Sequence, residues 1–339
     1  SLTNFDIGAA GTDRLVVIIA DVENTGAGAD LTGVTVDSKA CNHIVTADNP
    51  TGAGNHQEMW YCDEDDLGAS SGPVTVAITS GVTGWGVHAH LYTGVDQGGP
   101  ADFGIDNTSA ATNTVIVNGI DAPANGLVVM GAAEGTQGLA VNTWTSPLVE
   151  RTNSPDPSSA DLMTASDIET SAQTNKTYTA TFSGTHNRAT GIVASWAEVS
   201  TTTIDDGTDP GNVTIAPEAA ITDLDVFTLV ASTGTDTVTA ATVTLGPAGA
   251  FNNIGQADIT DASNVAQCTA ITNPGSNTLS FTGCTIPVTD TVTTFKVRIT
   301  PKTHASMPAV PGASYAVTGT ITAFTSTNAQ AGTDTDSAT

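Results

Sequence analysis

The stretch "GIVASWAEVSTTTIDDGTDPGN", residues 191–212, divides the chain and decides how its fold is read. An apolar, strand-like run ends at Val199 in a string of threonines, and three aspartates then crowd into five positions among glycine and proline. Gly, Pro, Asp and Thr at this density end strands and form turns. We therefore predict a domain boundary here, with domains over 1–200 and 213–339 and an acidic Gly/Pro linker over 201–212.

Strand patterns recur on both sides of this boundary. In the first part, "RLVVIIADV" (14–22) and "NGLVVMGAA" (125–133) are continuous apolar runs, which are typical of strands covered on both faces. In the second part, "FKVRITP" (295–301) and "YAVTGTITAF" (315–324) alternate with period two, as half-buried strands do. The sequence thus predicts an all-β fold of two antiparallel β-sandwich domains in series. The N-terminal domain is the larger, jelly-roll or Ig-like with about eight to ten strands, and the C-terminal one is smaller and Ig-like.

Charge and length limit the partners of the chain. Its 339 residues carry 35 acidic and 8 basic side chains, which gives a formal net charge of -27. This surface repels phosphate, so we expect no nucleic-acid partner. The longest apolar run, Leu15 to Ala20, is far shorter than the roughly 18 residues of a membrane helix, so we expect no membrane insertion. The opening "SLTNFDIG" lacks the charged and apolar regions of an export signal, so we expect that any such signal has already been removed or left out.

The four cysteines fall as one local pair in each half, Cys41 with Cys62 and Cys268 with Cys284. This even arrangement without C-x-x-C spacing favours two disulfides and an oxidising, extracellular or cell-surface location. Four reduced, buried thiols are the alternative. Short N-x-[ST] sequons add candidate glycosylation sites at Asn107, Asn175 and Asn212.

Two acidic clusters are candidate cation sites, because calcium takes about six to eight hard oxygen ligands. Neither cluster follows the D-x-[DN]-x-[DN]-G pattern of a calcium-binding loop. At the domain boundary, bound calcium and a solvated linker are both open interpretations, and calcium there would stiffen the junction. In the other cluster the alternative is a solvated loop. The clusters are Asp205, Asp206 and Asp209 at the boundary, and Asp63, Glu64, Asp65 and Asp66 after Cys62.

The sequence contains no local signature of catalysis. It has no G-x-S-x-G, H-E-x-x-H or Walker pattern, so we expect the protein not to be an enzyme. His88 and His90 lie two apart on a predicted strand and share a face, as two metal ligands would, but no third ligand is apparent. Six aromatic residues are candidate stacking platforms for glycans, although Trp196 alternates with apolar positions as a core residue does. They are Trp60, Tyr61, Trp85, Tyr92, Trp144 and Trp196.

The order of several segments resembles a known type of module. "DRLVVIIADVE", "EMWYCDEDD", "GPVTVAITS", "LYTGVDQGGP", "NGLVVMGAA" and "GIVASWAEV" resemble a β-sandwich module of large secreted or surface-displayed prokaryotic and phage-associated proteins. In that module the turn reads F-x-G-V-D-Q, and here Tyr92 replaces the Phe. The second half, from "DGTDPGNVTIAP" onward, resembles an Ig-like module repeated in very large surface proteins. The resemblance implies the fold and a surface location, and it brings no catalytic residues.

Together these features predict a structural subunit of an extracellular assembly, such as a filament, sheet or surface layer, built by self-association. An adhesin or carbohydrate-binding module displayed on a cell or phage surface is the alternative. The end, "NAQAGTDTDSAT" (328–339), is polar and turn-like where resembling modules continue into one more strand, so we expect an open sheet edge. The opening residues 1–8 are a candidate donor strand from another copy, through Leu2, Phe5 and Ile7. A trimmed parent chain, or a domain that closes without this strand, is the alternative.

Overall fold

The chain divides into two compact units, unit 1 over Ser1–Val199 and unit 2 over Ser200–Thr339. Both units are built almost entirely from β-strands, so the predicted all-β fold class is confirmed. The computed structural model describes residues 1–11, 13–24, 31–49, 54–80, 85–108, 111–135, 139–154, 161–186, 188–211, 213–307 and 314–335.

The first half of unit 1 forms two antiparallel sheets. The outer sheet has the strand order β1-β7-β3-β4, and the inner sheet has the order β5-β6-β2-β8. A one-turn helix, α1 (Glu64–Leu67), follows β6. The strands are β1 (Leu2–Asp6), β2 (Leu15–Asn24), β3 (Leu31–Val36), β4 (Lys39–Ala40), β5 (Asn42–Asp48), β6 (Gly54–Cys62), β7 (Pro73–Ser80) and β8 (Trp85–Tyr92).

The second half of unit 1 forms two further antiparallel sheets. The inner sheet has the order β13-β14-β11-β16-β9, and the outer sheet has the order β10-β15-β12. The strands are β9 (Asp102–Thr108), β10 (Thr112–Ala122), β11 (Gly126–Glu134), β12 (Val141–Trp144), β13 (Val149–Ser154), β14 (Asp161–Glu169), β15 (Gln173–His186) and β16 (Ala189–Trp196).

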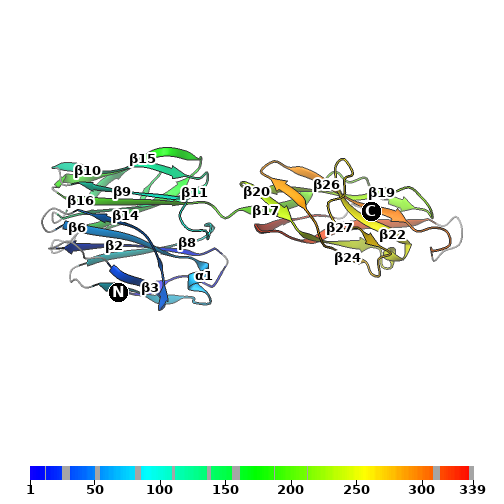
Figure 1. The fold of residues 1–339 in the computed structure, drawn as a ribbon, viewed down its shortest axis with the longest axis horizontal. Helices are drawn as coiled ribbons and strands as arrows, with labels where there is room; N and C mark the ends of the chain where they lie inside the picture. Colours follow the sequence, from blue (N-terminus) through cyan, green and yellow to red (C-terminus); the bar gives the residue numbers. More distant parts are fainter. Residues whose placement is uncertain are drawn as a thin grey trace. The chain divides into compact units, whose positions relative to one another are not determined.

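These four sheets stack as layers around three apolar cores, and Figure 1 shows the two inner sheets between the outer strands β10 and β15 on one side and β3 on the other. Alternate side chains of β2 serve two cores. Val16 and Ile18 pack toward the first outer sheet, whereas Val17 and Ile19 pack toward the second inner sheet. Strand β11 is buried along its whole length in the same way. The two continuous apolar runs are therefore the central strands of the two inner sheets.

The two halves of unit 1 repeat one pairing pattern. Strand β2 lies between β6 and β8, and β11 lies between β14 and β16. In the outer sheets β7 joins β1 to β3, and β15 joins β10 to β12. The predicted single sandwich of eight to ten strands is therefore wrong for unit 1. The two apolar runs, β2 and β11, lie in different inner sheets, and four stacked layers bury both faces of each.

Unit 2 places two main sheets around one core. The larger sheet has the order β23-β22-β26-β19-β17-β28, and the smaller has the order β18-β27-β21-β24; β20 and β25 pair separately. The predicted period-two strand over 295–301 is confirmed: Phe295, Val297 and Ile299 are buried in the core. The first strands are β17 (Thr201–Asp206), β18 (Val213–Ile215), β19 (Thr222–Ala231), β20 (Thr235–Val238) and β21 (Ala240–Gly246). They are followed by η1 (Ala250–Asn253), β22 (Ile254–Asp261), β23 (Ile271–Thr272), β24 (Thr278–Phe281), β25 (Ile286–Thr289), β26 (Thr293–Pro301), β27 (Tyr315–Thr325) and β28 (Ala329–Thr333).

Two features of unit 2 differ from the sequence prediction. The predicted linker over 201–212 begins with β17, which pairs antiparallel with β19, because Thr202 and Ile204 point into the unit and are buried. The end of the chain, predicted to be turn-like, contains β28. This strand pairs parallel with β17 and is the outermost strand of the larger sheet.

Candidate functional site

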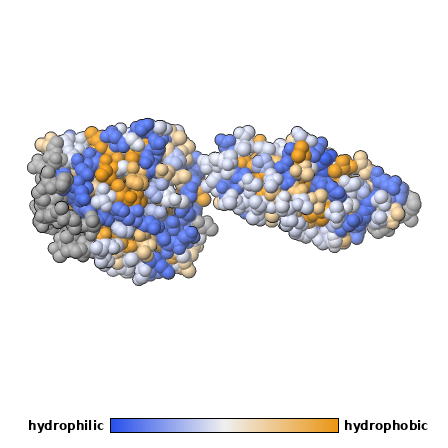
Figure 2. Space-filling model, in the orientation of Figure 1, coloured by the Kyte–Doolittle hydropathy of each residue, from blue (hydrophilic) through white to orange (hydrophobic). Residues whose placement is uncertain are grey.

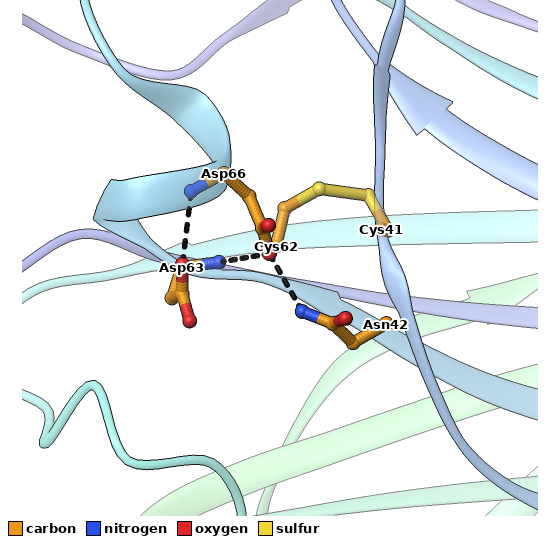
Figure 3. The surroundings of a disulfide bond; sticks show 5 residues. All are labelled: Cys41, Asn42, Cys62, Asp63 and Asp66. Carbon is orange, nitrogen blue, oxygen red and sulfur yellow. Dashed lines mark hydrogen bonds between the residues drawn. A yellow bond between two sulfur atoms is a disulfide. The ribbon is translucent and has the colours of Figure 1, made fainter.

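Both predicted disulfides are present. Cys41 lies just before β5 and Cys62 ends β6, and both are buried in the core between the first outer and inner sheets. Figure 3 shows the acidic helix α1 beside this bond, where Asn42 donates a hydrogen bond to Asp66. Cys268 and Cys284 belong to the core of unit 2. Each bond closes a short loop and contributes about 3 kcal/mol by constraining the unfolded chain.

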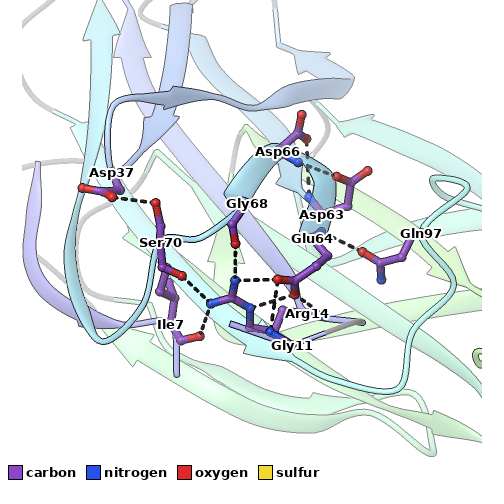
Figure 4. Close-up of polar contacts among 10 residues, drawn as sticks. All are labelled: Ile7, Gly11, Arg14, Asp37, Asp63, Glu64, Asp66, Gly68, Ser70 and Gln97. Carbon is purple, nitrogen blue, oxygen red and sulfur yellow. Dashed lines mark hydrogen bonds and ion pairs between the residues drawn. The ribbon is translucent and has the colours of Figure 1, made fainter. Parts of the chain in front are cut away.

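Most carboxylates of the acidic cluster after Cys62 accept hydrogen bonds from donor groups of the same chain. Asp63 caps helix α1 and accepts a hydrogen bond from the Asp66 amide, and Asp66 accepts from the Asp63 amide. Glu64 forms a two-point ion pair with Arg14, with N–O distances of 2.7 and 2.8 Å (Figure 4). Asp65 remains exposed. This arrangement favours the structural interpretation of these four acids over a shared cation.

Arg14 is the centre of a buried polar network in unit 1. Its side chain is almost fully buried, and it donates to the carbonyls of Ile7, Gly68 and Ser70 as well as to Glu64 (Figure 4). Hydrogen bonding to Arg14 lowers the pKa of Glu64. The network ties the end of β1, the start of β2 and the segment after α1 together.

The two strand histidines are not exposed as a ligand pair. His88 and His90 on β8 are half-buried, and His90 lies 2.9 Å from the Thr164 hydroxyl of the second inner sheet. Burial lowers the pKa of His90 to about 4 and also lowers the pKa of His88. Both imidazoles are therefore neutral at pH 7 and pack between the two inner sheets.

The candidate aromatic platforms are mostly engaged in packing. Trp196 is fully buried, and Tyr61 packs edge-on against it at 6.5 Å between ring centroids. Trp60 is half-buried and donates its indole N–H to Glu58. Tyr92 and Trp144 are half-buried, and the Trp85 side chain lies outside the described residues. None of the five described rings therefore stands fully exposed as a flat platform.

Sequence reasoning missed a buried acid–histidine group on β6. His56 and Glu58 lie two residues apart and are both about 2% exposed; the His56 ring contacts Glu58 at 2.6 Å and Asp48 at 2.5 Å. Burial opposes the charged imidazolium, but the hydrogen bonds to Glu58 and Asp48 prevail and raise the pKa of His56 to about 9. Period two in "HQE" was the available signal, because it places both side chains on one face.

The predicted donor segment is part of unit 1 of its own chain. Residues 2–6 form β1, which pairs with β7 at the edge of the outer sheet. Leu2 and Phe5 pack half-buried against the core, and Ile7 is fully buried in it. This placement differs from a free donor strand, because the apolar pocket for Ile7 lies in the same unit. Of the sequons, Asn107 and Asn175 are exposed, and Asn212 lies outside the described residues.

Unit 1 exposes apolar side chains despite the acidic composition. Figure 2 shows apolar residues gathered in a band across the visible face of this unit. Phe103 and Ile105 on β9 are 48% and 42% exposed, and Ile116 on β10 is 40% exposed. The Ile116 amide donates to Asp106, so β9 and β10 are neighbours here. The surface of unit 1 therefore includes an apolar area on adjoining strands.

A groove of about 440 Å³ lies in unit 2 beside the outer edge of β27. Strand β18 covers this edge only along Tyr315–Val317, so within the described residues no strand pairs with it from Thr318 onward. The Ile321 amide on this edge donates instead to the Asp334 carboxylate at 2.6 Å. The groove is lined by Ile204, Ile321, Thr322, Ala323, Phe324, Gln330, Ala331, Gly332, Thr333 and Asp334.

Strand β28 forms the opposite wall of this groove and is held at both ends by carboxylates. Asp236 accepts hydrogen bonds from Thr202 on β17 and from Thr327 and Asn328 just before β28. Asp236 is buried, which opposes its charge, but these donors prevail and lower its pKa to about 2. Gly332 has φ +80°, and a Cβ there would lie 1.9 Å from the Ile204 carbonyl oxygen, so only glycine permits this close pairing with β17.

The boundary aspartates separate into different environments. Asp205 is exposed on β17, and its carboxylate accepts only from the Asp206 amide among the bonds that the structure describes. Asp209 accepts a hydrogen bond from the Val226 amide and lies against two acids that sequence reasoning did not connect with it, Asp225 and Asp334. Burial and the neighbouring carboxylates raise the pKa of Asp225 to about 9 and that of Asp334 to about 6. The carboxylates that gather in unit 2 thus come from distant parts of the sequence.

Within the part of the chain that the structure describes, neither a formed metal site nor a membrane-spanning helix is present. In the described ranges no three Asp, Glu, His or Cys side chains have the arrangement of a formed metal site. No described helix is long and apolar enough to cross a membrane.

Comparison with known proteins adds little to this geometry. No protein-family model matches the chain, and no curated protein matches it. Among solved structures, the full-length major pilin SpaD from Corynebacterium diphtheriae aligns with 81% of this chain and 77% of its own, at 12% identity and a TM-score of 0.17. A TM-score this low supports no conclusion about fold or function. The module resemblance seen in the sequence therefore stays a prediction.

Proposed function

We propose that the chain is a non-catalytic structural subunit of an extracellular assembly, in which copies join by adding a strand to the open edge of β27. The observation that carries this proposal is the groove between that edge and β28. An edge strand with unpaired backbone groups recruits another strand, and apolar side chains beside it supply specificity. The larger apolar side chains that line the groove are Ile321 and Phe324 on β27 and Ile204 on β17, of which both isoleucines are buried.

The proposed occupant is β1 of a second copy. This strand is five residues long, lies at a sheet edge, and pairs with β7 with an irregularity between Leu2 and Phe5; just beyond it, backbone hydrogen bonds join Ile7 and Gly8 to Gly72. The part of this β27 edge that no described strand covers, from Thr318 to Thr325, is long enough to receive it, and the incoming strand has to displace Asp334 from the Ile321 amide. Exchange requires β1 to leave β7 and its apolar side chains to leave the core of their own unit, whereas the inner sheets contain no part of β1. The exchanged strand then links each copy to the next.

The environment proposed for this assembly is the cell exterior. Two disulfides favour an oxidising compartment, and a net charge of -27 suits a saline medium that screens repulsion between copies. Repulsion between copies weakens as salt rises. Assembly is accordingly expected to be stronger at about 0.15 M salt, where the Debye length is about 8 Å, than at low salt.

The test fills the groove without disturbing the core. Ala331→Trp places a large side chain in the groove from an exposed position on β28, and Ala329→Trp is the matched control on the same strand outside the groove. We expect the unmodified chain and Ala329→Trp to form multimers in light scattering and negative-stain images, and Ala331→Trp to remain monomeric. Equal assembly of both variants, or a chain that stays monomeric throughout, would refute the proposal.

A further inference from the structure

Carboxylates from three distant segments converge at one end of the larger sheet of unit 2. Asp209 follows β17, Asp225 lies on β19, and Asp334 follows β28. The parallel pairing of Asp205 with Thr333 brings the ends of β17 and β28 together, and Asp209 binds the amide of the residue that follows Asp225. Asp209 and Asp334 both lie close enough to Asp225 to raise the pKa of its carboxyl group.

Asp225 is the unusual member of this group. It is 0% exposed, and neither of its carboxylate oxygens has a hydrogen-bond donor. Oδ1 of Asp334, which is 8% exposed, also has no donor, while its Oδ2 accepts from the Ile321 amide. A buried carboxylate without donors is costly unless a proton or a cation balances it.

The basic side chains on the neighbouring strand do not supply that balance. Lys296 and Arg298 on β26 both pair with Asp223, at 2.9 and 2.7 Å, on the outer side of the sheet. A strand irregularity between Asp223 and Asp225 turns the second aspartate inward. Asp225 therefore faces other carboxylates, and none of the ion pairs that the structure describes includes it.

We propose that Asp209, Asp225 and Asp334 bind one divalent cation of the calcium type, with Asp206 beside them. All the side-chain donors are hard carboxylate oxygens, which suit calcium and magnesium rather than zinc. Calcium tolerates irregular oxygen cages at about 2.3 to 2.6 Å, whereas magnesium demands a regular octahedron. The predicted boundary site is thus revised: its ligands all come from unit 2, and Asp205 is not among them.

Binding requires a small rearrangement. The described side chains do not yet have the arrangement of a formed site. Asp225 is fixed on a central strand, but Asp206 and Asp209 lie at and just after the end of β17, where rotation of side chains brings oxygens inward. Because Asp334 also holds the Ile321 amide, the cation would fasten the end of β28 to the sandwich. The buried carboxylates, and not the proposed assembly, motivate this inference.

The test adds calcium chloride to the full chain after treatment with a chelator. Titration calorimetry measures binding of the ion, and scanning calorimetry measures the unfolding temperatures. All four tryptophans lie in unit 1, so the unfolding transition that leaves tryptophan fluorescence unchanged belongs to unit 2. Asp225→Asn is the decisive variant, because its amide keeps the shape and can donate to Asp209 and Asp334. Asp205→Asn, which removes an exposed charge nearby, is the matched control.

We expect one calcium ion per chain and a rise in the unit 2 transition temperature, both retained in Asp205→Asn and lost in Asp225→Asn, with magnesium at least tenfold weaker. No heat and no shift in the unmodified chain would overturn the proposal and leave a proton shared among the carboxyl groups. Calcium binding that survives unchanged in Asp225→Asn would also overturn it, by placing the ion elsewhere. A unit 2 transition temperature that is higher in metal-free Asp225→Asn than in the metal-free unmodified chain would show that this variant folds.

Discussion

Replacing Arg14 by alanine should destabilise unit 1 and leave unit 2 unchanged. The guanidinium makes two bonds to Glu64, at 2.7 and 2.8 Å, and three to the carbonyls of Ile7, Gly68 and Ser70, at 2.8 to 3.2 Å. The Arg14 side chain is 3% exposed and that of Glu64 is 13% exposed. Removing one partner of a buried ion pair costs about 3 to 5 kcal/mol, because the other charge stays buried without compensation. Water reaching Glu64 places the expected loss toward the lower value.

Urea unfolding followed by tryptophan fluorescence measures this loss. Trp60, Trp85, Trp144 and Trp196 all belong to unit 1, so the signal reports that unit alone. With an unchanged slope, a loss of about 3 kcal/mol lowers the urea midpoint by more than about 1 M. Arg298→Ala is the control, since it breaks a more exposed pair in unit 2. A loss below about 1 kcal/mol for Arg14→Ala would show that the network does not hold unit 1 together.

The difference in the stability of unit 1 between the unmodified chain and Arg14→Ala should depend on pH. Arg14 lowers the pKa of Glu64, so the stabilisation by the pair is complete above the pKa of Glu64 in the unfolded chain. It is lost as pH falls through the lowered pKa of the folded chain. The two proteins should therefore converge in stability in acid. A difference that stays constant down to that range would contradict the role given to the ion pair.

Two further predictions follow from the buried group on β6 and from β28. Because the pKa of His56 is raised to about 9, its stabilisation of unit 1 should be complete below about pH 6.5 and disappear as pH rises through about 9. A His56→Asn variant should lose this pH dependence in unfolding followed by tryptophan fluorescence. An identical loss of stability at alkaline pH in both proteins would count against this role of His56. Gly332→Ala should displace β28, because the new Cβ meets the Ile204 carbonyl; hydrogen exchange of the β17 and β28 amides should then rise at least tenfold, whereas Gly275→Ala, where nothing lies within 4 Å, should change nothing there.

Local patterns in the sequence were sufficient to predict the all-β class and several central strands, but not β17 or β28. The alternation in 295–301 and the two apolar runs reflect burial of one face or of both faces, and burial is a local property of a strand. The cysteine pairs were also predictable, because Cys41 and Cys62 are close in sequence. The number of layers was not, since it depends on which faces of β2 and β11 meet.

The groups that define the candidate sites lie far apart in the sequence. Asp334 and Asp225 are brought together only by the parallel pairing of β28 with β17, and neither acid belongs to a visible cluster. Conversely, in the conspicuous cluster at 63–66, Asp63 and Asp66 cap helix α1 and Glu64 pairs with Arg14. Density of carboxylates in sequence thus predicted neither their burial nor their partners, because both are decided by strand pairing over long separations.

The most direct test of the proposed assembly is cross-linking between two differently marked copies. One copy carries Thr3→Cys on β1, and the other carries Ala323→Cys on the open edge of β27; both positions are exposed. A short bismaleimide should join these two copies efficiently and should join Thr3→Cys to the control Ala329→Cys at least tenfold less. Absence of the first product, or equal yields of both, would contradict strand addition at β27.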